Sequence, residues 1–114
     1  CGGVLAALRN DSFGLIDGWL CHIGDIRDAH HKELSALVGE TARHDRLCEI
    51  NVIEQALNVC KTDVVQAAWK RGQPLAVHGW VYRLTDGLLH DIEGFASSPA
   101  DMRKLEAAIA EMRA

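Results

Sequence analysis

The sequence predicts an α/β protein that is mostly helical and carries a terminal two-stranded antiparallel hairpin. Apolar residues recur every three or four positions over most of the chain, which is typical of amphipathic helices. A β-branched and aromatic run from Pro74 to Tyr82 interrupts this pattern and indicates a strand. The Asp86-Gly87 pair that follows is a strong hairpin turn signal. With 114 residues, the chain is one domain at most.

The composition is that of an ordinary soluble globular protein, and it excludes two classes of partner. The net charge is −4 and no basic cluster extends beyond Lys70-Arg71, so no nucleic-acid-binding face is expected. No apolar run approaches the ~20 residues that span a bilayer, so no membrane segment is expected, and the first residues lack the pattern of a signal peptide. The chain begins at Cys1 without an initiator Met, so we expect a processed product or a fragment of a longer protein.

The first helix follows a cysteine and two glycines. Val4 to Leu8 is a run of good helix formers that ends at Asn10, and Cys1, Gly2 and Gly3 stand directly before it. The N-terminus of a helix carries free N–H groups and partial positive charge, which stabilise a thiolate or a bound anion. The position of Cys1 therefore suggests chemistry at its thiol.

The stretch from Phe13 to Glu33 predicts one helix, or two helices broken near Gly18 or Gly24. Its expected apolar face consists of Phe13, Ile16, Leu20, Ile23 and Ile26. Its histidines are expected on the surface, because adjacent residues point about 100° apart on a helix and do not easily share one metal ion. These histidines are His22, His30 and His31.

The longest helix is expected from Ala42 to Cys60, after a connector over residues 34–40, with Thr41 as its cap. Its apolar stripe predicts heavy burial; the stripe is Leu47, Ile50, Ile53, Leu57 and Cys60. Thr62 and Arg71-Gly72 are the start and stop signals of the next helix. The segment Ser98-Pro99-Ala100-Asp101 predicts a last helix over 98–114, whose apolar face is Met102, Leu105, Ile109 and Met112.

The strand from Leu75 to Tyr82 is predicted to be buried, and Gly79 within it marks a close approach of other atoms to the backbone. His78 and Trp80 are expected to be core groups rather than a ligand or a proton shuttle. The second strand follows Asp86-Gly87 and runs antiparallel to the first.

Three of the four cysteines are expected to be small buried hydrophobes, because they lie in helical patterns: Cys21, Cys48 and Cys60. The spacings are wide and irregular, and there is no Cys-x-x-Cys pair. We expect free thiols in a reducing compartment, and therefore a cytoplasmic protein.

Four segments together resemble the β-class carbonic anhydrases, and most closely the bacterial members of that class. The segments are Cys1-Gly2-Gly3-Val4-x-Ala6-Ala7, Leu47-Cys48-Glu49-Ile50-Asn51-Val52-x-x-Gln55, Ala68-Trp69-Lys70-Arg71-Gly72-Gln73, and His78-Gly79-Trp80-Val81-Tyr82 with Asp86-Gly87-Leu88-Leu89. The resemblance covers about residues 1 to 92. It implies a mostly parallel sheet flanked by helices, whose first three strands precede the zinc cysteine. This chain would then be a single incomplete domain over 1–114 that lacks the N-terminal strands.

The resemblance also implies a zinc lyase that interconverts carbon dioxide and bicarbonate and works as a homodimer or tetramer when complete. Cys1 matches the second zinc cysteine of the family, and Gly2 and Gly3 match the active-site floor beside it. The other two ligands, and the Asp-Arg pair that orients the zinc-bound water, would precede residue 1, so no catalytic residue lies within this stretch. Tyr82 matches a tyrosine that holds a regulatory bicarbonate in some members; the other interpretation is a core or interface tyrosine.

Catalytic zinc needs about three protein ligands, so we expect this chain alone to be inactive and to bind zinc weakly. We also expect poor solubility, because a two-stranded sheet is marginal and its edges are unpaired. One alternative is a non-catalytic, degenerate homologue or oligomerisation remnant. Another is a hydrolase with Cys1 as an N-terminal nucleophile, although such folds are rich in β-structure and this chain is mostly helical.

Overall fold

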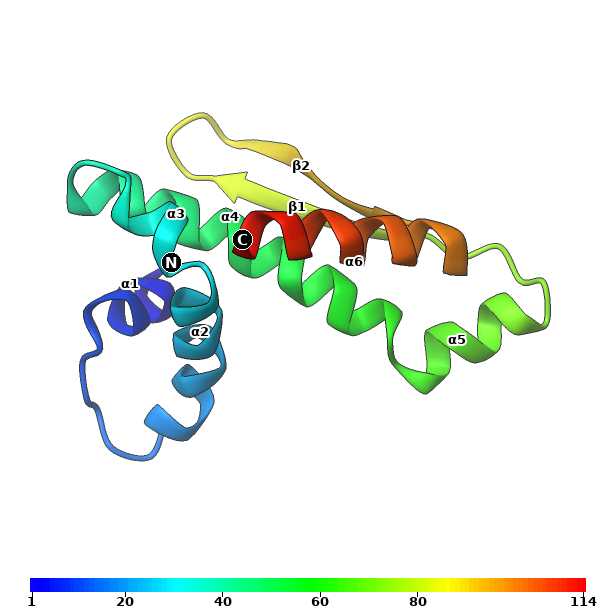
Figure 1. The fold of residues 1–114 in the computed structure, drawn as a ribbon, viewed down its shortest axis with the longest axis horizontal. Coiled ribbons are helices and arrows are strands. Elements are labelled where there is room, and N and C mark those ends of the chain that lie inside the picture. Colours follow the sequence, from blue (N-terminus) through cyan, green and yellow to red (C-terminus); the bar gives the residue numbers. More distant parts are fainter. The chain divides into compact units, whose positions relative to one another are not determined.

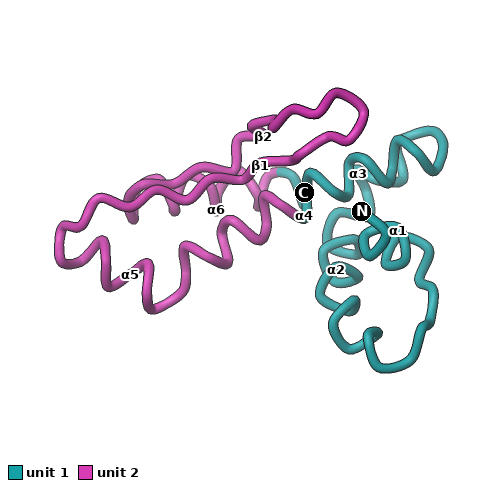
Figure 2. Tube along the Cα trace, turned by 180° about the vertical axis from the view of Figure 1, so that it is seen from behind, with its two compact units in different colours: residues 1–51, 112–114 teal, residues 52–111 magenta.

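The computed structural model describes residues 1–114 and contains six helices and one hairpin (Figure 1). In chain order the elements are α1 (Gly2–Arg9), α2 (Asp17–Ala29), α3 (His31–Ser35), α4 (Glu40–Cys60), α5 (Asp63–Lys70), β1 (Val77–Arg83), β2 (Leu88–Ala96) and α6 (Pro99–Arg113). The chain forms two compact units, shown in Figure 2. We call them the helical unit, residues 1–51 and 112–114, and the hairpin unit, residues 52–111.

α1 forms where the sequence predicts it and ends at a left-handed residue. Asn10 has φ 57°, and the N–H groups of Asn10 and Asp11 donate to the carbonyls of Ala7 and Ala6 at 3.2 and 3.0 Å. These bonds satisfy carbonyls at the helix end that have no partner within the helix, and asparagine tolerates this conformation better than most residues.

The break in the second helical stretch is at His30, so the predicted break near Gly18 or Gly24 is wrong. The helix also starts late, because the Asp17 carboxylate accepts hydrogen bonds from the N–H groups of Phe13 and Gly14 and from the Ser12 hydroxyl. Those bonds hold residues 13–16 in a turn outside α2. Phe13 and Ile16 are consequently exposed, whereas the sequence pattern places them on the apolar face.

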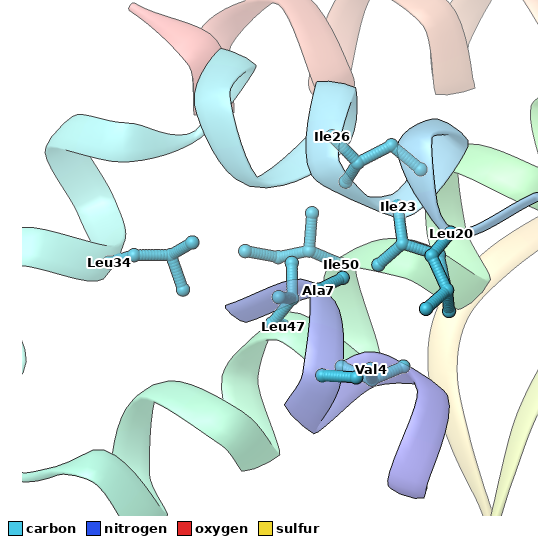
Figure 3. Close-up of a cluster of buried hydrophobic side chains, with 9 residues drawn as sticks. Val4, Ala7, Leu20, Ile23, Ile26, Leu34, Leu47 and Ile50 are labelled. Atoms are coloured by element: carbon cyan, nitrogen blue, oxygen red, sulfur yellow. The ribbon is translucent and has the colours of Figure 1, made fainter. Parts of the chain in front are cut away.

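The core of the helical unit is a cluster of apolar side chains from four helices that point toward one another (Figure 3). α2 contributes three of the five predicted apolar residues, Leu20, Ile23 and Ile26, and α4 contributes Leu47 and Ile50. α1 and α3 complete the cluster with Val4, Ala6, Ala7 and Leu34. Among the histidines, His22 and His31 are exposed as expected, but His30 is buried at the junction of α2 and α3, so its predicted surface position is wrong.

The predicted stripe of α4 is confirmed, because all five of its residues are buried. The helix starts two residues earlier than predicted, so Thr41 lies inside it rather than capping it. α5 follows Thr62 as expected, but the Thr62 hydroxyl donates to the carbonyl of Val59 at 2.7 Å and makes no bond to α5. Gly72, with φ 76°, ends this segment as predicted.

The hairpin pairs β1 with β2 in the predicted antiparallel sense, and the turn contains Gly87 with φ 69°. The register shifts between Gly79 and Trp80, whose partners are Gly94 and Asp91, so β2 carries a two-residue bulge. Gly79 confirms the predicted close approach. A Cβ atom there would lie 3.1 Å from the Cα and carbonyl oxygen of Gly94 and 3.2 Å from Cγ1 of Val52 in α4.

The prediction that β1 is a buried strand is wrong, because Gly79 alone among its residues is buried. The face with the two glycines packs on α4, and the opposite face is exposed. His78 and Trp80 lie on that opposite face, so they are not the core groups that the sequence pattern suggests. The His78 ring instead lies 5.1 Å, between centroids, from the rings of Trp80 and Phe95.

α6 begins with the predicted capping arrangement. The Ser98 hydroxyl accepts from the N–H of Asp101 at 3.1 Å, and the Asp101 carboxylate accepts from the N–H of Ser97 at 3.0 Å. Leu105 and Ile109 are buried, and Glu106 pairs with Lys61 at 2.6 Å. No helix of the chain is long and apolar enough to span a membrane.

The cysteines confirm one of the three burial predictions. Cys60 is fully buried and Cys48 is half-buried, so the prediction holds for Cys60. Cys21 is exposed, and its thiol donates to the carbonyl of Gly18 within α2 at 3.0 Å, so its predicted burial is wrong.

Candidate functional site

Cys1 is exposed and is the N-cap residue of α1. Its carbonyl accepts the first helical hydrogen bond, from the N–H of Leu5 at 3.1 Å. The thiol therefore lies at the end of the helix where unpaired N–H groups and the helix dipole favour negative charge. This position favours the thiolate form that a metal ion or an electrophile requires.

Contacts along α1 fix the direction of this helix in the helical unit. Val4 and Ala7 are buried in the core, and the carbonyl of Ala7 accepts a hydrogen bond from Nη1 of Arg27 in α2 at 2.5 Å. Near its C-terminal end, Arg9 binds both carboxylate oxygens of Glu40, at 2.5 and 3.0 Å. That bond to Arg9 lowers the pKa of Glu40, so the pair stays charged through mildly acidic pH.

Two side chains of α4 contact the backbone of Cys1. Nε2 of His44 lies 2.9 Å from the Cys1 carbonyl oxygen and 3.5 Å from the Cys1 nitrogen. Sγ of Cys48, one helical turn later on the same face, lies 4.0 Å from the Cys1 nitrogen. Burial raises the pKa of the Cys48 thiol. Cys48 is thus a neutral thiol near the backbone of Cys1.

The two glycines after Cys1 have different surroundings. A Cβ atom on Gly2 would meet nothing within 4 Å, so the space beside the thiol is open there. A Cβ atom on Gly3 would lie 3.4 Å from the Trp19 ring and 3.5 Å from Leu20, so Gly3 faces α2. Gly2 is exposed, so the space beside it is open to solvent. The predicted role of both glycines in an active-site floor stays a prediction.

Tyr82 belongs to the hairpin unit and is 58% exposed on the outer face of β1. Its hydroxyl oxygen lies 3.9 Å from the position of a Cβ atom on Gly87, so its ring leans toward the hairpin turn. An exposed phenol can donate a hydrogen bond to an anion, but it can equally contact a partner protein. Both interpretations of Tyr82 therefore stay predictions.

A metal ion is held by several side chains together, and Cys1 is considered as a single ligand. No group of three His, Cys, Asp or Glu side chains among residues 1–114 could hold a metal ion. Cys1 fits the requirement for a single ligand, since it is exposed and stands at a helix N-terminus. His44 is a further residue near Cys1 that the sequence motifs do not indicate. Its four-residue spacing from Cys48 on a predicted helix is the signal that could have found it.

Comparison with known proteins supports one family. A protein-family model described as carbonic anhydrase matches residues 1–89. A carbonic anhydrase of Emericella nidulans is 43% identical over 106 residues, which cover 92% of this chain and 46% of that protein. A carbonic anhydrase of Pseudomonas aeruginosa is 32% identical over 95 residues, which cover 82% of this chain and 41% of that protein.

Solved structures give the same result for the fold. A Coccomyxa β-carbonic anhydrase in complex with acetazolamide matches with a TM-score of 0.78 and 30% identity, over 97% of this chain and 54% of that chain. A β-carbonic anhydrase of Aspergillus fumigatus matches with a TM-score of 0.74 and 32% identity, over 96% and 51%. The chain thus spans about half the length of the relatives that it matches.

Proposed function

The chain belongs to the β-carbonic anhydrase family, and from this premise we propose that it is part of a zinc lyase that interconverts carbon dioxide and bicarbonate. The observation that carries the proposal is the place of Cys1. It is an exposed thiol at the N-terminus of α1, inside the region that the family model matches. The Cys-Gly-Gly start of the helix is also the segment whose resemblance to the family assigns a metal ligand.

In this proposal Cys1 is one zinc ligand, and the remaining ligands come from a part of a longer protein that this chain does not span. Zinc would supply the Lewis acidity that makes water a nucleophile near neutral pH. The residues of this chain would hold the ligand and leave space for the substrate. The N-terminus of α1 would hold Cys1 as a thiolate, and the open space at Gly2 would admit a small substrate.

The proposal extends to the organisation of the protein. Residues 1–114 would form part of one domain, with the last helix at its C-terminal end, in a cytoplasmic homodimer or tetramer. Tyr82 would bind a regulatory bicarbonate through its exposed hydroxyl. Replacing Tyr82 by Phe in a complete enzyme should then weaken inhibition by bicarbonate, and unaltered inhibition would remove this role.

The test of the main proposal is Cys1→Ser in a longer protein that contains this segment. We expect the variant to lose stoichiometric zinc and hydration activity together, because a serine hydroxyl is a poor zinc ligand at neutral pH. Cys21→Ser is the matched control, since Cys21 is also exposed but lies in α2. Zinc is measured by atomic emission and activity by stopped-flow pH change. Retention of full zinc by Cys1→Ser would refute the proposal.

The isolated 114-residue chain provides a second test. We propose that it has no hydration activity and binds zinc weakly, because no group of three side chains in it could hold a metal ion. Tight stoichiometric zinc in the purified chain contradicts this. A longer protein with Cys1 intact but without zinc would favour the non-catalytic remnant instead. An adduct of Cys1 with an electrophilic glutamine analogue would favour the N-terminal hydrolase.

A further inference from the structure

We propose that His44 is a positioning residue for Cys1, which it holds by a hydrogen bond from its Nε2–H to the Cys1 carbonyl. The inference rests on the proposed function, because it gives His44 a purpose only if Cys1 is a zinc ligand. It adds a residue on α4 to a site whose ligand stands on α1.

The contact has the geometry of a true hydrogen bond. Nε2 of His44 lies 2.9 Å from the carbonyl oxygen of Cys1, which is the usual distance for an N–H donor. A carbonyl oxygen only accepts, so Nε2 must carry the hydrogen, and the neutral ring must be the Nε2–H tautomer. The 3.5 Å separation of Nε2 from the Cys1 nitrogen is then a contact rather than a second bond.

The backbone of α4 next to His44 is held in place by the core of the helical unit. Leu47 and Ile50, which follow His44 on α4, are both 0% exposed and belong to the cluster that also contains Val4 of α1. His44 itself is half-buried, which limits the conformations of its side chain. An imidazole on so firmly packed a helix can hold the peptide group of Cys1 in one orientation.

Two side chains of α4 contact Cys1 on either side of its Cα atom, one at the carbonyl and one at the nitrogen. His44 binds the carbonyl, and Sγ of Cys48 lies 4.0 Å from the nitrogen. Within α1, the carbonyl of Cys1 has one other partner, the N–H of Leu5. Without His44, the hydrogen bond from Leu5 alone would orient Cys1. Because helix ends fray, the direction of the Cys1 thiol would then be less well defined.

Groups that orient a metal ligand without touching the metal change metal affinity by about 10- to 100-fold when they are removed. We expect His44→Leu to shorten the half-time of zinc transfer to a chelator by about ten-fold. His44→Gln keeps an N–H donor at a similar reach and should restore most of the half-time. His22→Leu and His22→Gln are the matched controls, because His22 is exposed on α2 of the same unit.

The experiment uses a longer protein that contains this segment, loaded with zinc, and a parallel sample loaded with cobalt. The thiolate-to-cobalt absorption band should move in His44→Leu and return in His44→Gln, which a purely structural role would not produce. Wild-type zinc retention in His44→Leu, or failure of His44→Gln to restore it, overturns the inference.

Two further readouts keep the result interpretable. Long-range nitrogen–proton NMR spectra of the unsubstituted protein at alkaline pH should show the Nε2–H tautomer of His44, and the Nδ1–H tautomer would overturn the inference even if His44→Leu failed to fold. Cys1→Ser separates the two proposals. If Cys1→Ser loses zinc and His44→Leu retains it, only the role of His44 fails; if Cys1→Ser keeps its zinc, the proposed function fails as well.

Discussion

The helical unit buries its apolar side chains more completely than the hairpin unit does, although α4 supplies buried residues to both. The helical unit brings the apolar faces of four helices into one cluster. The hairpin unit buries one face of its sheet, with Gly79 and Gly94 against α4 and Ala96 fully buried, and exposes the other face. The exposed apolar side chains of the hairpin are Trp80, Tyr82, Leu84, Leu88, Leu89 and Phe95.

The difference shows that a few short helices can bury their apolar surface more completely than a two-stranded sheet can. A helix has one apolar stripe, and a few short helices cover each other's stripes. A sheet has two faces and two edges, so a two-stranded sheet with one helix against it leaves half of its surface in water. Apolar residues at helical spacing therefore form a core in one unit, whereas the apolar and aromatic run of β1 leaves an exposed surface in the other.

The largest expected effect is in the core of the helical unit. Leu47→Ala should lower the free energy of unfolding of the 114-residue chain by about 2–5 kcal/mol, because Leu47 is 0% exposed and its loss leaves a cavity. The matched change in the hairpin, Leu88→Ala, should cost less than about 0.5 kcal/mol, since Leu88 is 59% exposed. Urea unfolding followed by circular dichroism measures both. Equal losses would break the comparison between the units.

The contact of the hairpin with α4 comes next. Gly79→Ala should lower the free energy of unfolding by about 1–3 kcal/mol, because the new Cβ atom meets the backbone of Gly94 at 3.1 Å. Gly18→Ala is the opposite case in α2, since a Cβ atom there meets nothing within 4 Å. It should stabilise the chain by about 0.5–1 kcal/mol. A neutral Gly79→Ala in the same unfolding assay would show that the strand does not press on α4.

The N-terminus of α6 gives a smaller effect. Ser98→Ala should lower the free energy of unfolding by about 1 kcal/mol, because its hydroxyl caps the N–H of Asp101. Ser35→Ala in α3 of the helical unit is the control; that hydroxyl contacts His31 on the surface, so its loss should fall within about 0.5 kcal/mol. Hydrogen exchange of the first α6 amides locates the effect, and unchanged exchange in Ser98→Ala would contradict it.

The smallest expected effect is a pH dependence of folding stability that comes from Asp101 at the same helix N-terminus. Hydrogen bonds from the N–H and hydroxyl of Ser97 lower the pKa of Asp101 below its usual 3.8. A carboxylate with a lowered pKa stabilises the folded state above its usual pKa, and this stability is lost as the pH falls through the lowered value. Thermal midpoints of the wild type should therefore fall more steeply below about pH 4 than those of Asp101→Asn. Parallel curves for the two proteins would remove this contribution.

The sequence predicted the buried stripe of α4 and the capped start of α6 well, because apolar periodicity and capping residues are local signals. It failed at Phe13 and Ile16, where hydrogen bonds to Asp17 hold a turn outside the helix. It also failed at His30 and along β1, because a periodic pattern shows which residues share a face but not what covers that face. Burial of a strand depends on neighbouring elements that the pattern does not contain.

The site was predictable only in part. The thiol of Cys1 at a helix start follows from its neighbours in the sequence, and the family resemblance adds its role. The approach of His44 and Cys48 to Cys1 depends on how α4 packs against α1, across more than forty residues of chain. Such a contact is set by the tertiary fold, and no local pattern around Cys1 indicates it.

The paired glycines of the hairpin also limit how the protein can evolve. Of the three atoms nearest to a Cβ atom at Gly79, only Cγ1 of Val52 belongs to a group that another mutation could remove. The other two are the Cα and carbonyl oxygen of Gly94, which every residue possesses. A compensating Val52→Ala would therefore recover only part of the stability that a substitution at Gly79 removes. Gly79 is a position where drift is blocked by backbone atoms, and the choice of side chains nearby cannot reopen it.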